Sequence, residues 1–181
     1  MSELKSPTDM FALLKDIQHR SQQSAAKHSK QDVHGSWTAI GFRIAEQRFL
    51  VPLNETREVF TVPSQITAVP KSQPWVFGIA NLRGELLPLF DLKYFLYGTA
   101  TKINKRSRIV VNNHPKLYSG LLLDEVFGLK HFQQEPELQD DLSDNAISAY
   151  VTGSIDQQDM TWNVFSFKKL AADQRFLNAA V

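Results

Sequence analysis

Histidine, aspartate, glutamate and serine are the residues through which this chain could bind a metal ion or catalyse a reaction. Five histidines could serve as metal ligands, namely His19, His28, His34, His114 and His131. They lack the spacing of a helical zinc site, and the 181-residue chain has no Cys to accompany them. Four of the five fall in segments predicted to be tails, turns or linkers. We therefore expect no metal site, no disulfide and no cofactor.

Asp124 and Glu125 form the acidic pair that most resembles a general acid and base. They end an apolar run predicted to be a strand, where adjacent side chains point to opposite faces and cannot share one substrate. A turn-forming role is the better interpretation. The sequence also lacks the G-x-S-x-G of hydrolases and the glycine-rich loops that hold phosphates. We predict that the protein is not an enzyme, with a hydrolase that carries no recognisable motif as the alternative.

Charge is distributed unevenly along the chain, although the formal net charge is only +1. Residues 102–116 include five Lys or Arg and no acid, whereas residues 117–181 hold four Lys or Arg against ten Asp or Glu. Half of these acids lie in EPELQDDLSD, 135–144, which is predicted to be a solvated loop. The basic run KINKRSR, 102–108, permits the hypothesis of a β-barrel protein that binds single-stranded nucleic acid. No aromatic residue is interleaved with this run, so we expect no nucleic-acid partner.

The elements that position these residues follow from the apolar periodicity. From Trp37 onward, about eleven short β-rich runs alternate with turn signals, a pattern typical of small barrels rather than of a parallel sheet with crossover helices. The runs are 37–45, 48–52, 57–62, 66–69, 76–82, 86–91, 108–112, 117–123, 126–132, 149–155 and 161–167. Helices are predicted over 92–96 and, near the end of the chain, over 168–177.

Residues 1–36 have a different composition from the rest. Ser6, Pro7 and Asp9 suit a helix start, and a narrow apolar stripe follows at helical spacing. The stripe consists of Met10, Leu13, Leu14 and Ile17. We predict one amphipathic helix and a polar tether over 1–36, followed by a single domain over 37–178. The helix either packs on that domain or frays, or it serves as a docking arm for a partner.

Hydropathy predicts a cytoplasmic protein. The apolar run at residues 10–14 is too short for a signal peptide and has acidic neighbours. No window reaches 18 consecutive apolar residues, so we expect no direct membrane insertion.

The segment GIANLRGELLPLFDL, 78–92, combines a largely apolar composition with three polar side chains near its middle, Asn81, Arg83 and Glu85. The pattern N-L-R-G-x-h-h-P-h-h-D-L within it, where h is hydrophobic, resembles the signature of CheW-like domains. Further matches lie at 40–52, 57–59, 66–70, 75–78, 121–128 and 150–153, and the resemblance covers about residues 37–178. Ser166 departs from the pattern, since the family often has Asp or Asn there.

The resemblance implies a mainly β fold, in which two five-stranded SH3-like barrels pack on a shared hydrophobic seam, with short helices and a C-terminal helix. It implies a scaffold that couples a CheA-type histidine kinase to the cytoplasmic domain of a methyl-accepting chemoreceptor and is recruited to membrane-associated receptor arrays. The N-terminal extension, Trp75 and the exact sequence of 78–92 look most like family members of type IV pilus chemosensory systems, which control twitching motility. A flagellar-type chemotaxis coupling protein is the alternative.

The resemblance also implies the contact residues. Receptor contact is predicted at Arg83, with Asn81 and Leu82 setting its strand and turn, and at Thr56, whereas kinase contact is predicted at Glu58 and Phe60. The runs 76–82 and 86–91 can pair as a hairpin that walls the seam, with Arg83 and Gly84 at its turn. Two structural alternatives stay open. Arg83 could cap a carbonyl or pair with Glu85, and Phe60 could be a core residue.

Overall fold

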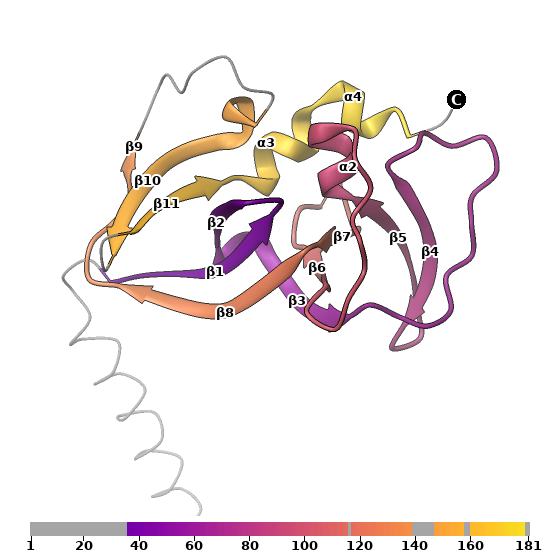
Figure 1. The fold of residues 1–181 in the computed structure, drawn as a ribbon, viewed down its shortest axis with the longest axis horizontal. Coiled ribbons are helices and arrows are strands. Elements are labelled where there is room, and N and C mark those ends of the chain that lie inside the picture. Colours follow the sequence, from indigo (N-terminus) through magenta and orange to yellow (C-terminus); the bar gives the residue numbers. More distant parts are fainter. Residues whose placement is uncertain (1–35, 116, 139–146, 158–159, 180–181) are drawn as a thin grey trace, which may run out of the picture. The chain divides into compact units, whose positions relative to one another are not determined.

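Two β-sheets carry the fold of this computed structural model, which describes residues 36–115, 117–138, 147–157 and 160–179 (Figure 1). The helix and tether predicted over residues 1–36 lie outside these ranges, apart from Ser36. No helix in the described ranges is long and apolar enough to cross a membrane.

The first sheet has six strands in the order β8-β1-β2-β11-β10-β9. Its strands are β1 (Trp37–Ile44), β2 (Gln47–Pro52), β8 (Glu125–Phe132), β9 (Glu137–Leu138), β10 (Val151–Gln157) and β11 (Met160–Phe165). Neighbours pair antiparallel except β11 and β2, which are parallel. This sheet therefore joins strands from the beginning of the domain to strands from its end.

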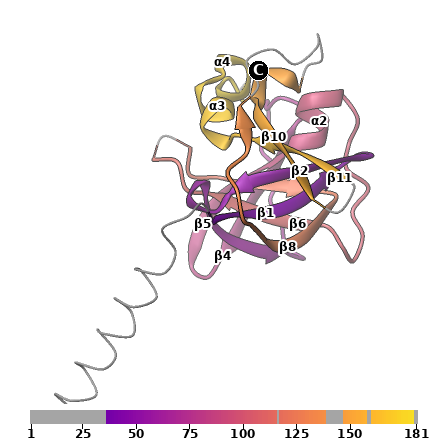
Figure 2. The same ribbon diagram turned by 90° about the vertical axis from the view of Figure 1, so that its left-hand side faces the viewer.

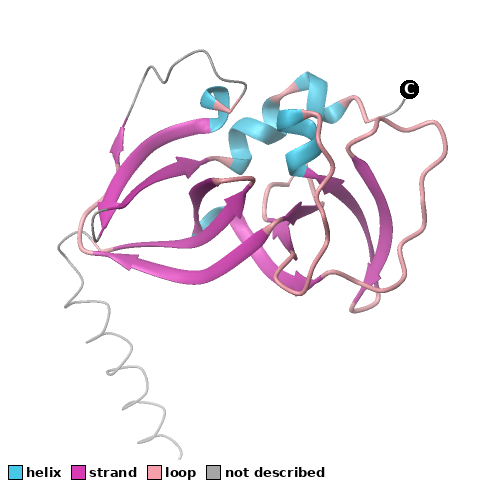
Figure 3. Ribbon diagram, in the orientation of Figure 1, coloured by secondary structure: helices cyan, strands magenta, loops and turns pink. Residues whose placement is uncertain are grey.

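The second sheet is built from one continuous part of the chain and has five strands in the order β3-β6-β7-β5-β4. Its strands are β3 (Thr56–Thr61), β4 (Val76–Leu82), β5 (Glu85–Asp91), β6 (Arg108–Asn112) and β7 (Gly120–Leu123). Figure 2 shows the two sheets from a second direction, and Figure 3 shows how strands dominate over helices. The predicted mainly β class with two small sheets is confirmed.

The short helices are η1 (Leu53–Glu55), α2 (Leu92–Tyr97), η2 (Ser148–Tyr150), α3 (Phe167–Ala172) and α4 (Gln174–Leu177), and η1 connects the first sheet to the second. Asp91 begins α2 by accepting a hydrogen bond from the Tyr94 amide, and it also accepts from the amide and the hydroxyl of Thr101. Gly98 ends α2 in the left-handed conformation at φ 66°. The aspartate of the 78–92 segment thus has a structural role.

The N-terminus of α3 links the two sheets through a buried carboxylate. Ser166 caps the helix by accepting from the Lys169 amide and donates its hydroxyl hydrogen to Glu55, which also accepts from the Lys168 amide. Glu55 lies in η1, between β2 of one sheet and β3 of the other. Serine at this position therefore retains a capping function that Asp or Asn would also supply.

The main apolar cluster is shared by both sheets, as the predicted seam requires. The six-stranded sheet contributes Phe42, Phe49 and Phe165, and the five-stranded sheet contributes Phe90 and Leu121. The helices add Leu92, Leu96, Phe167, Leu170 and Phe176. Each sheet also has a smaller cluster of its own, built around Trp162 in the first and Leu122 in the second.

Only part of the 78–92 segment lines the hydrophobic seam between the two sheets, whereas the prediction placed the whole hairpin there. Phe90 and Leu92 belong to the shared cluster, whereas Ala80, Leu87 and Leu89 belong to the cluster of the five-stranded sheet. Alternate side chains of a strand point to opposite faces, so one strand supplies both clusters. The second half of β5 is buried on both faces, at Leu89 and Phe90, whereas Leu86 is 72% exposed.

Three predicted elements are wrong in detail. Residues 66–69 form no strand but a single bridge between Thr67 and Ile79. Within the acidic loop predicted at 135–144, β9 pairs with Gly153 and Ser154, which gives the first sheet six strands instead of five. The predicted helix at 168–177 is divided at Asp173, which ends α3 and caps α4.

Gly78 explains why residues 66–69 stay irregular. Its φ is 142°, and a Cβ atom there would lie 2.5 Å from the Ile66 side chain and 2.7 Å from the Thr67 carbonyl oxygen. Such a close approach requires glycine. The chain before β4 therefore lies directly on the strand at this point, with a bridge instead of a continuous ladder.

Candidate functional site

The β4–β5 connection is a two-residue turn that holds Arg83 at the tip of a hairpin. Leu82 pairs with Glu85, and the two residues between them have positive φ, 55° for Arg83 and 88° for Gly84. These values are typical of the type I′ turn that joins tightly twisted strands. The Asn81 side chain accepts a hydrogen bond of 2.8 Å from the Gly84 amide, which stabilises the turn. The predicted hairpin is confirmed, with the addition that Arg83 itself adopts the left-handed conformation.

Arg83 crosses from the hairpin to β3, where two side chains hold its guanidinium. One of its terminal nitrogens forms an ion pair with Glu58, and its guanidinium carbon lies 5.3 Å from the centroid of the Phe60 ring. The Arg83 side chain nevertheless stays 74% exposed. Glu85 is therefore not the partner of Arg83, contrary to the structural alternative.

Glu85 belongs to a second, similar arrangement beside the first. Its carboxylate lies 3.7 Å from an Arg57 nitrogen and accepts a hydrogen bond from the Tyr118 hydroxyl. The Arg57 guanidinium lies 5.1 Å from the centroid of the Tyr118 ring. The hydrogen bond to Glu85 is the main cause that raises the pKa of Tyr118 above its usual value. Each arginine thus contacts one carboxylate and one aromatic ring.

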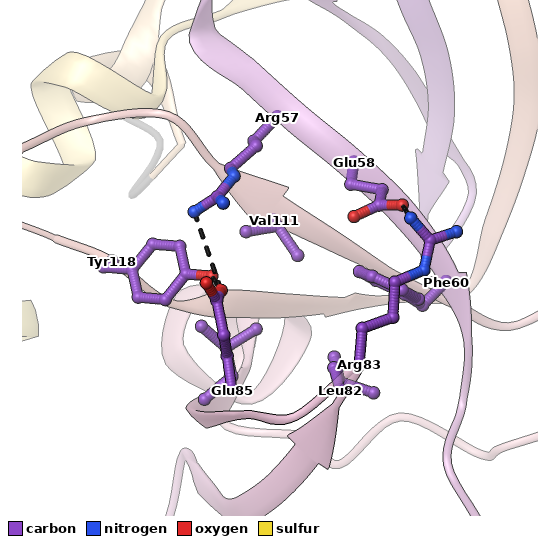
Figure 4. A pocket seen from close by; sticks show the side chains of 9 residues that line it. Arg57, Glu58, Phe60, Leu82, Arg83, Glu85, Val111 and Tyr118 are labelled. Atoms are coloured by element: carbon purple, nitrogen blue, oxygen red, sulfur yellow. Dashed lines mark hydrogen bonds and ion pairs between the residues drawn. The ribbon is translucent and has the colours of Figure 1, made fainter.

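Between the two arrangements lies a hollow of about 190 Å³ (Figure 4). Leu82, Leu87 and Val111 supply its apolar lining. Arg57, Glu58, Phe60, Arg83, Glu85 and Tyr118 complete the lining. We call these nine residues the β3–β5 hollow. Apolar side chains beside arginine and aromatic side chains are the combination that protein-contact sites favour.

The structure brings four of the six predicted contact residues together in this hollow. Leu82 and Arg83 were predicted for the receptor, and Glu58 and Phe60 for the kinase, yet all four line the same space. Asn81 lies next to it and supports the turn. Thr56 is buried at the start of β3, donates to the Leu53 carbonyl oxygen at 2.9 Å and does not line the hollow.

Arg57, Glu85 and Tyr118 are the rim residues that sequence reasoning missed. The Glu85 carboxylate contacts Arg57 in β3 and Tyr118, two residues before β7, so the three positions span about sixty residues of chain. The alternation of charge in Arg57-Glu58 and Arg83-x-Glu85 was the available signal. It becomes interpretable only when β3 is known to face the hairpin.

Asp124 and Glu125 have structural roles, consistent with the turn-forming interpretation. Asp124 is buried, accepts a 2.7 Å hydrogen bond from the Ala45 amide and lies 3.5 Å from the Lys93 amine. Glu125 pairs with Arg43 at 3.2 Å. In the described part of the chain, no cluster of three His, Asp or Glu side chains is arranged to hold a metal ion.

Comparison with known proteins shows the family to which this chain belongs. Residues 38–175 match the model of the CheW-like domain, and the chain belongs to this family. Over the full length of both chains it is 37% identical to Protein PilI of Pseudomonas aeruginosa. It is also 30% identical to Chemotaxis protein CheW of Helicobacter pylori, with 77% of this chain and 86% of that protein aligned.

A solved structure shares the fold. The scaffolding protein TtCheW from Thermoanaerobacter tengcongensis superimposes with a TM-score of 0.60 at 24% identity, covering 71% of this chain and 88% of that one. The resemblance to CheW-like domains, and within the family to PilI, is therefore confirmed, and so is the CheW-like fold.

Proposed function

We propose that this protein is a non-enzymatic adaptor that couples the cytoplasmic tip of a methyl-accepting chemoreceptor to a CheA-type histidine kinase in the signalling that controls type IV pilus twitching motility. Family membership and the full-length similarity to PilI support this proposal. The protein would act in the cytoplasm, recruited to membrane-associated receptor arrays. A flagellar-type role is the alternative, because the chain is also 30% identical to a chemotaxis protein CheW.

The observation that carries the proposal is the exposed Arg83 at a rigid hairpin tip. Its turn is fixed by the Asn81 side chain and its guanidinium lies over Phe60, so little conformational entropy is lost when a partner binds. The planar guanidinium can meet a carboxylate or several carbonyl oxygens at once, while its stem packs on apolar surface. Receptor contact at Arg83, Leu82 and Asn81 is the part of the proposal that this geometry supports best.

Thr56, Glu58 and Phe60 have separate places in the proposal. Thr56 is buried, so we expect it to position β3 rather than to touch the receptor. Glu58 and Phe60 are proposed kinase contacts, and both also touch Arg83. A change at either residue therefore also changes the surroundings of Arg83, so receptor binding is to be measured beside kinase binding for each variant.

A pull-down with the full chain tests the proposal. Bait protein in lysate of the native cells should retain both a histidine kinase and a chemoreceptor, identified by mass spectrometry. A deletion strain should lose twitching and keep swimming if the pilus pathway is the right one. Recovery of neither partner would refute the adaptor function, and loss of swimming alone would favour the flagellar-type alternative.

A further inference from the structure

A second hollow lies where β3 and β6 meet, away from the residues that line the β3–β5 hollow. Thr61 at the end of β3 pairs with Arg108 at the start of β6, and both line this hollow. It measures about 480 Å³, which falls within the roughly 300–1,000 Å³ of small-molecule sites. The two hollows share no lining residue. We call this second site the basic hollow.

Part of the lining of the basic hollow is apolar. Val62, Pro63 and Ile66 follow β3 in the chain, and Ile103 belongs to the loop before β6. Val62 and Ile66 also pack against the apolar cluster of the five-stranded sheet, so the core holds them in place. Ile103 is 50% exposed although it is a large aliphatic residue. A flat or aliphatic group that covers these side chains would remove apolar surface from water.

The loop before β6 supplies the polar part of the lining and is held by its own hydrogen bonds. The Asn104 amide donates to the Ser107 hydroxyl oxygen at 3.0 Å, and the Asn104 side chain accepts from the Arg106 amide at 2.8 Å. Arg108 donates from one terminal nitrogen to the carbonyl oxygens of Lys105 and Ser107, both at 2.8 Å. The loop is thus ordered before any ligand arrives, which lowers the entropic cost of binding.

This loop retains donors that a ligand can use. Ser107 lines the hollow although it is only 1% exposed, and its hydroxyl keeps a hydrogen to donate while its oxygen accepts from Asn104. The hydrogen bonds of Arg108 use one terminal nitrogen, which leaves the N–H groups of the others. Among the residues that the structure describes, no carboxylate forms an ion pair with Lys105 or Arg108.

Two uncompensated cations and a hydroxyl beside an apolar surface suit a phosphate ester whose organic part is flat. A phosphate monoester carries about −1.5 to −2 charge at neutral pH and has three strong acceptor oxygens, so it can satisfy both cations. A single carboxylate would leave one of them without a counter-charge. The ammonium of lysine and the planar fork of arginine are both common phosphate ligands.

A compact ligand fits the basic hollow better than a polymer does. Proteins that bind single-stranded nucleic acid combine a long basic groove with aromatic side chains on which the bases stack. None of the residues that line the basic hollow is aromatic. Positive charge does not continue along the chain either, because residues 117–181 hold ten Asp or Glu against four Lys or Arg.

We propose that the basic hollow binds a free nucleotide. The phosphate lies against Lys105, Arg108 and the Ser107 hydroxyl, and the base covers Ile66 and Ile103. The proposal does not rest on the adaptor function, since no lining residue is shared with the β3–β5 hollow and no partner protein is needed for its test.

NMR titration of the isotope-labelled full chain with a panel of ribonucleoside monophosphates and diphosphates tests the proposal. At least one nucleotide should shift the amide signals of Asn104, Lys105 and Ser107 in a saturable way. Its affinity should fall as salt rises, because the contact pairs opposite charges. The parent nucleoside and inorganic phosphate should each bind at least about tenfold more weakly, since each supplies only one part of the ligand.

Variants at exposed positions of the loop assign the contacts without disturbing the core. Lys105→Ala should weaken nucleotide binding at least about tenfold, as the loss of a charge-assisted hydrogen bond does. Arg106→Ala is the matched control, because it removes the same charge from the next residue, which pairs with Glu125 and does not line the hollow. Its effect should stay below about twofold. Ile103→Ser should weaken the nucleotide but not ribose phosphate, which has no base.

Three outcomes would overturn the proposal. One is that no nucleotide of the panel binds saturably with shifts at the loop before β6. Another is an equal loss of affinity with Lys105→Ala and Arg106→Ala, which would mean attraction to the general charge of the loop. The third is a chain that binds a single-stranded oligonucleotide or phosphatidylglycerol vesicles but no free nucleotide, which would assign the cations to nucleic acid or to a lipid surface.

Discussion

At the scale of single residues, the rim of the β3–β5 hollow is held by ion pairs that a partner can open at small cost. Exposed pairs of this kind contribute about 0–1 kcal/mol, since water and salt screen them. Arg83 and Glu58 form such a pair, with side chains 74% and 33% exposed. The pair orients the guanidinium, and because only one of its nitrogens pairs with Glu58, its other N–H groups can donate to a partner. Arg83 is therefore suited to recognition more than to stability.

Arg83→Glu should abolish receptor binding while the protein stays folded. The change removes the guanidinium and places a second carboxylate beside Glu58, whereas no buried group loses a partner. Loss of an arginine hot spot commonly costs about 2 kcal/mol, which corresponds to roughly 30-fold weaker binding. Calorimetric titration against a receptor fragment measures this effect, and the melting temperature should stay within a few degrees of wild type.

Arg106→Glu is the matched control for that experiment. Arg106 is also 74% exposed and also forms one ion pair, with Glu125 at 3.5 Å. It should leave receptor binding unchanged. A variant at Arg83 that unfolds, or that binds receptor like the wild type, would mean that Arg83 is structural.

Glu58→Gln separates the two proposed contacts at one position. The amide keeps the size of the side chain but removes the charge that pairs with Arg83. We expect kinase affinity to fall, whereas receptor affinity should hold or rise by up to about fivefold, because the partner no longer competes with an internal carboxylate. Binding titrations with each partner measure both values. Unchanged kinase affinity would remove Glu58 from the proposed kinase surface.

At the scale of elements, Asp173 ties the last two helices to the body of the domain. It ends α3, caps α4 and accepts a hydrogen bond from the hydroxyl of Tyr150. A hydrogen bond from Arg175 is the main cause that lowers the pKa of Asp173 to about 2, and burial is the main cause that raises the pKa of Tyr150 to about 12. The tyrosine therefore stays a hydrogen-bond donor at neutral pH.

Asp173→Asn should destabilise the protein near neutral pH and have less effect in acid. A carboxyl whose pKa is lowered on folding contributes stability above its unfolded pKa, and that contribution disappears as the pH falls from about 4 toward 2. Because Arg175 is 70% exposed, we expect about 1 kcal/mol. Urea unfolding of both proteins at pH 6 and pH 3 measures the difference, which should shrink at pH 3. An equal difference at both pH values would contradict the ionic role, since asparagine keeps the caps.

At the scale of the whole molecule, the domain joins two sheets through one shared apolar cluster. The chain passes from one sheet to the other at η1, where the buried Glu55 accepts hydrogen bonds from the start of α3. Helices α3 and α4 also contribute side chains to the shared cluster. A domain built this way has its own core, and the match to the family model begins only at residue 38. We therefore propose that residues 37–178 fold without the segment that precedes them.

Deletion of residues 1–35 should leave a folded domain with a nearly unchanged melting temperature. An unchanged melting temperature would mean that the apolar stripe of Met10, Leu13, Leu14 and Ile17 does not stabilise the domain and can contact a partner in the full chain, as amphipathic helices commonly do. Twitching assays in a strain that carries the truncated chain should show a defect despite normal protein levels. A loss of several degrees in melting temperature would mean instead that the stripe packs on the domain.

Local chemistry determined most of what could be predicted from the sequence. Alternating apolar residues marked every described strand except β9, and Arg83-Gly84 between two apolar runs marked the hairpin turn, because these signals act within a few residues. The two-residue strand β9 is too short to show a period, and 66–69 has strand-like composition without a continuous partner. Both depend on which segment lies alongside.

Only the tertiary structure decided how the charged residues combine. Glu58 and Arg83 are 25 residues apart, and Arg57 and Glu85 are 28 apart, so nothing local distinguishes these pairs from other combinations of the same charges. The fold places β3 opposite the β4–β5 turn, and that placement produces one hollow where the sequence suggested two separate contact surfaces. The spacing of apolar residues determines which face of a strand is buried. The order of the strands in the sheets determines which charged side chains come together.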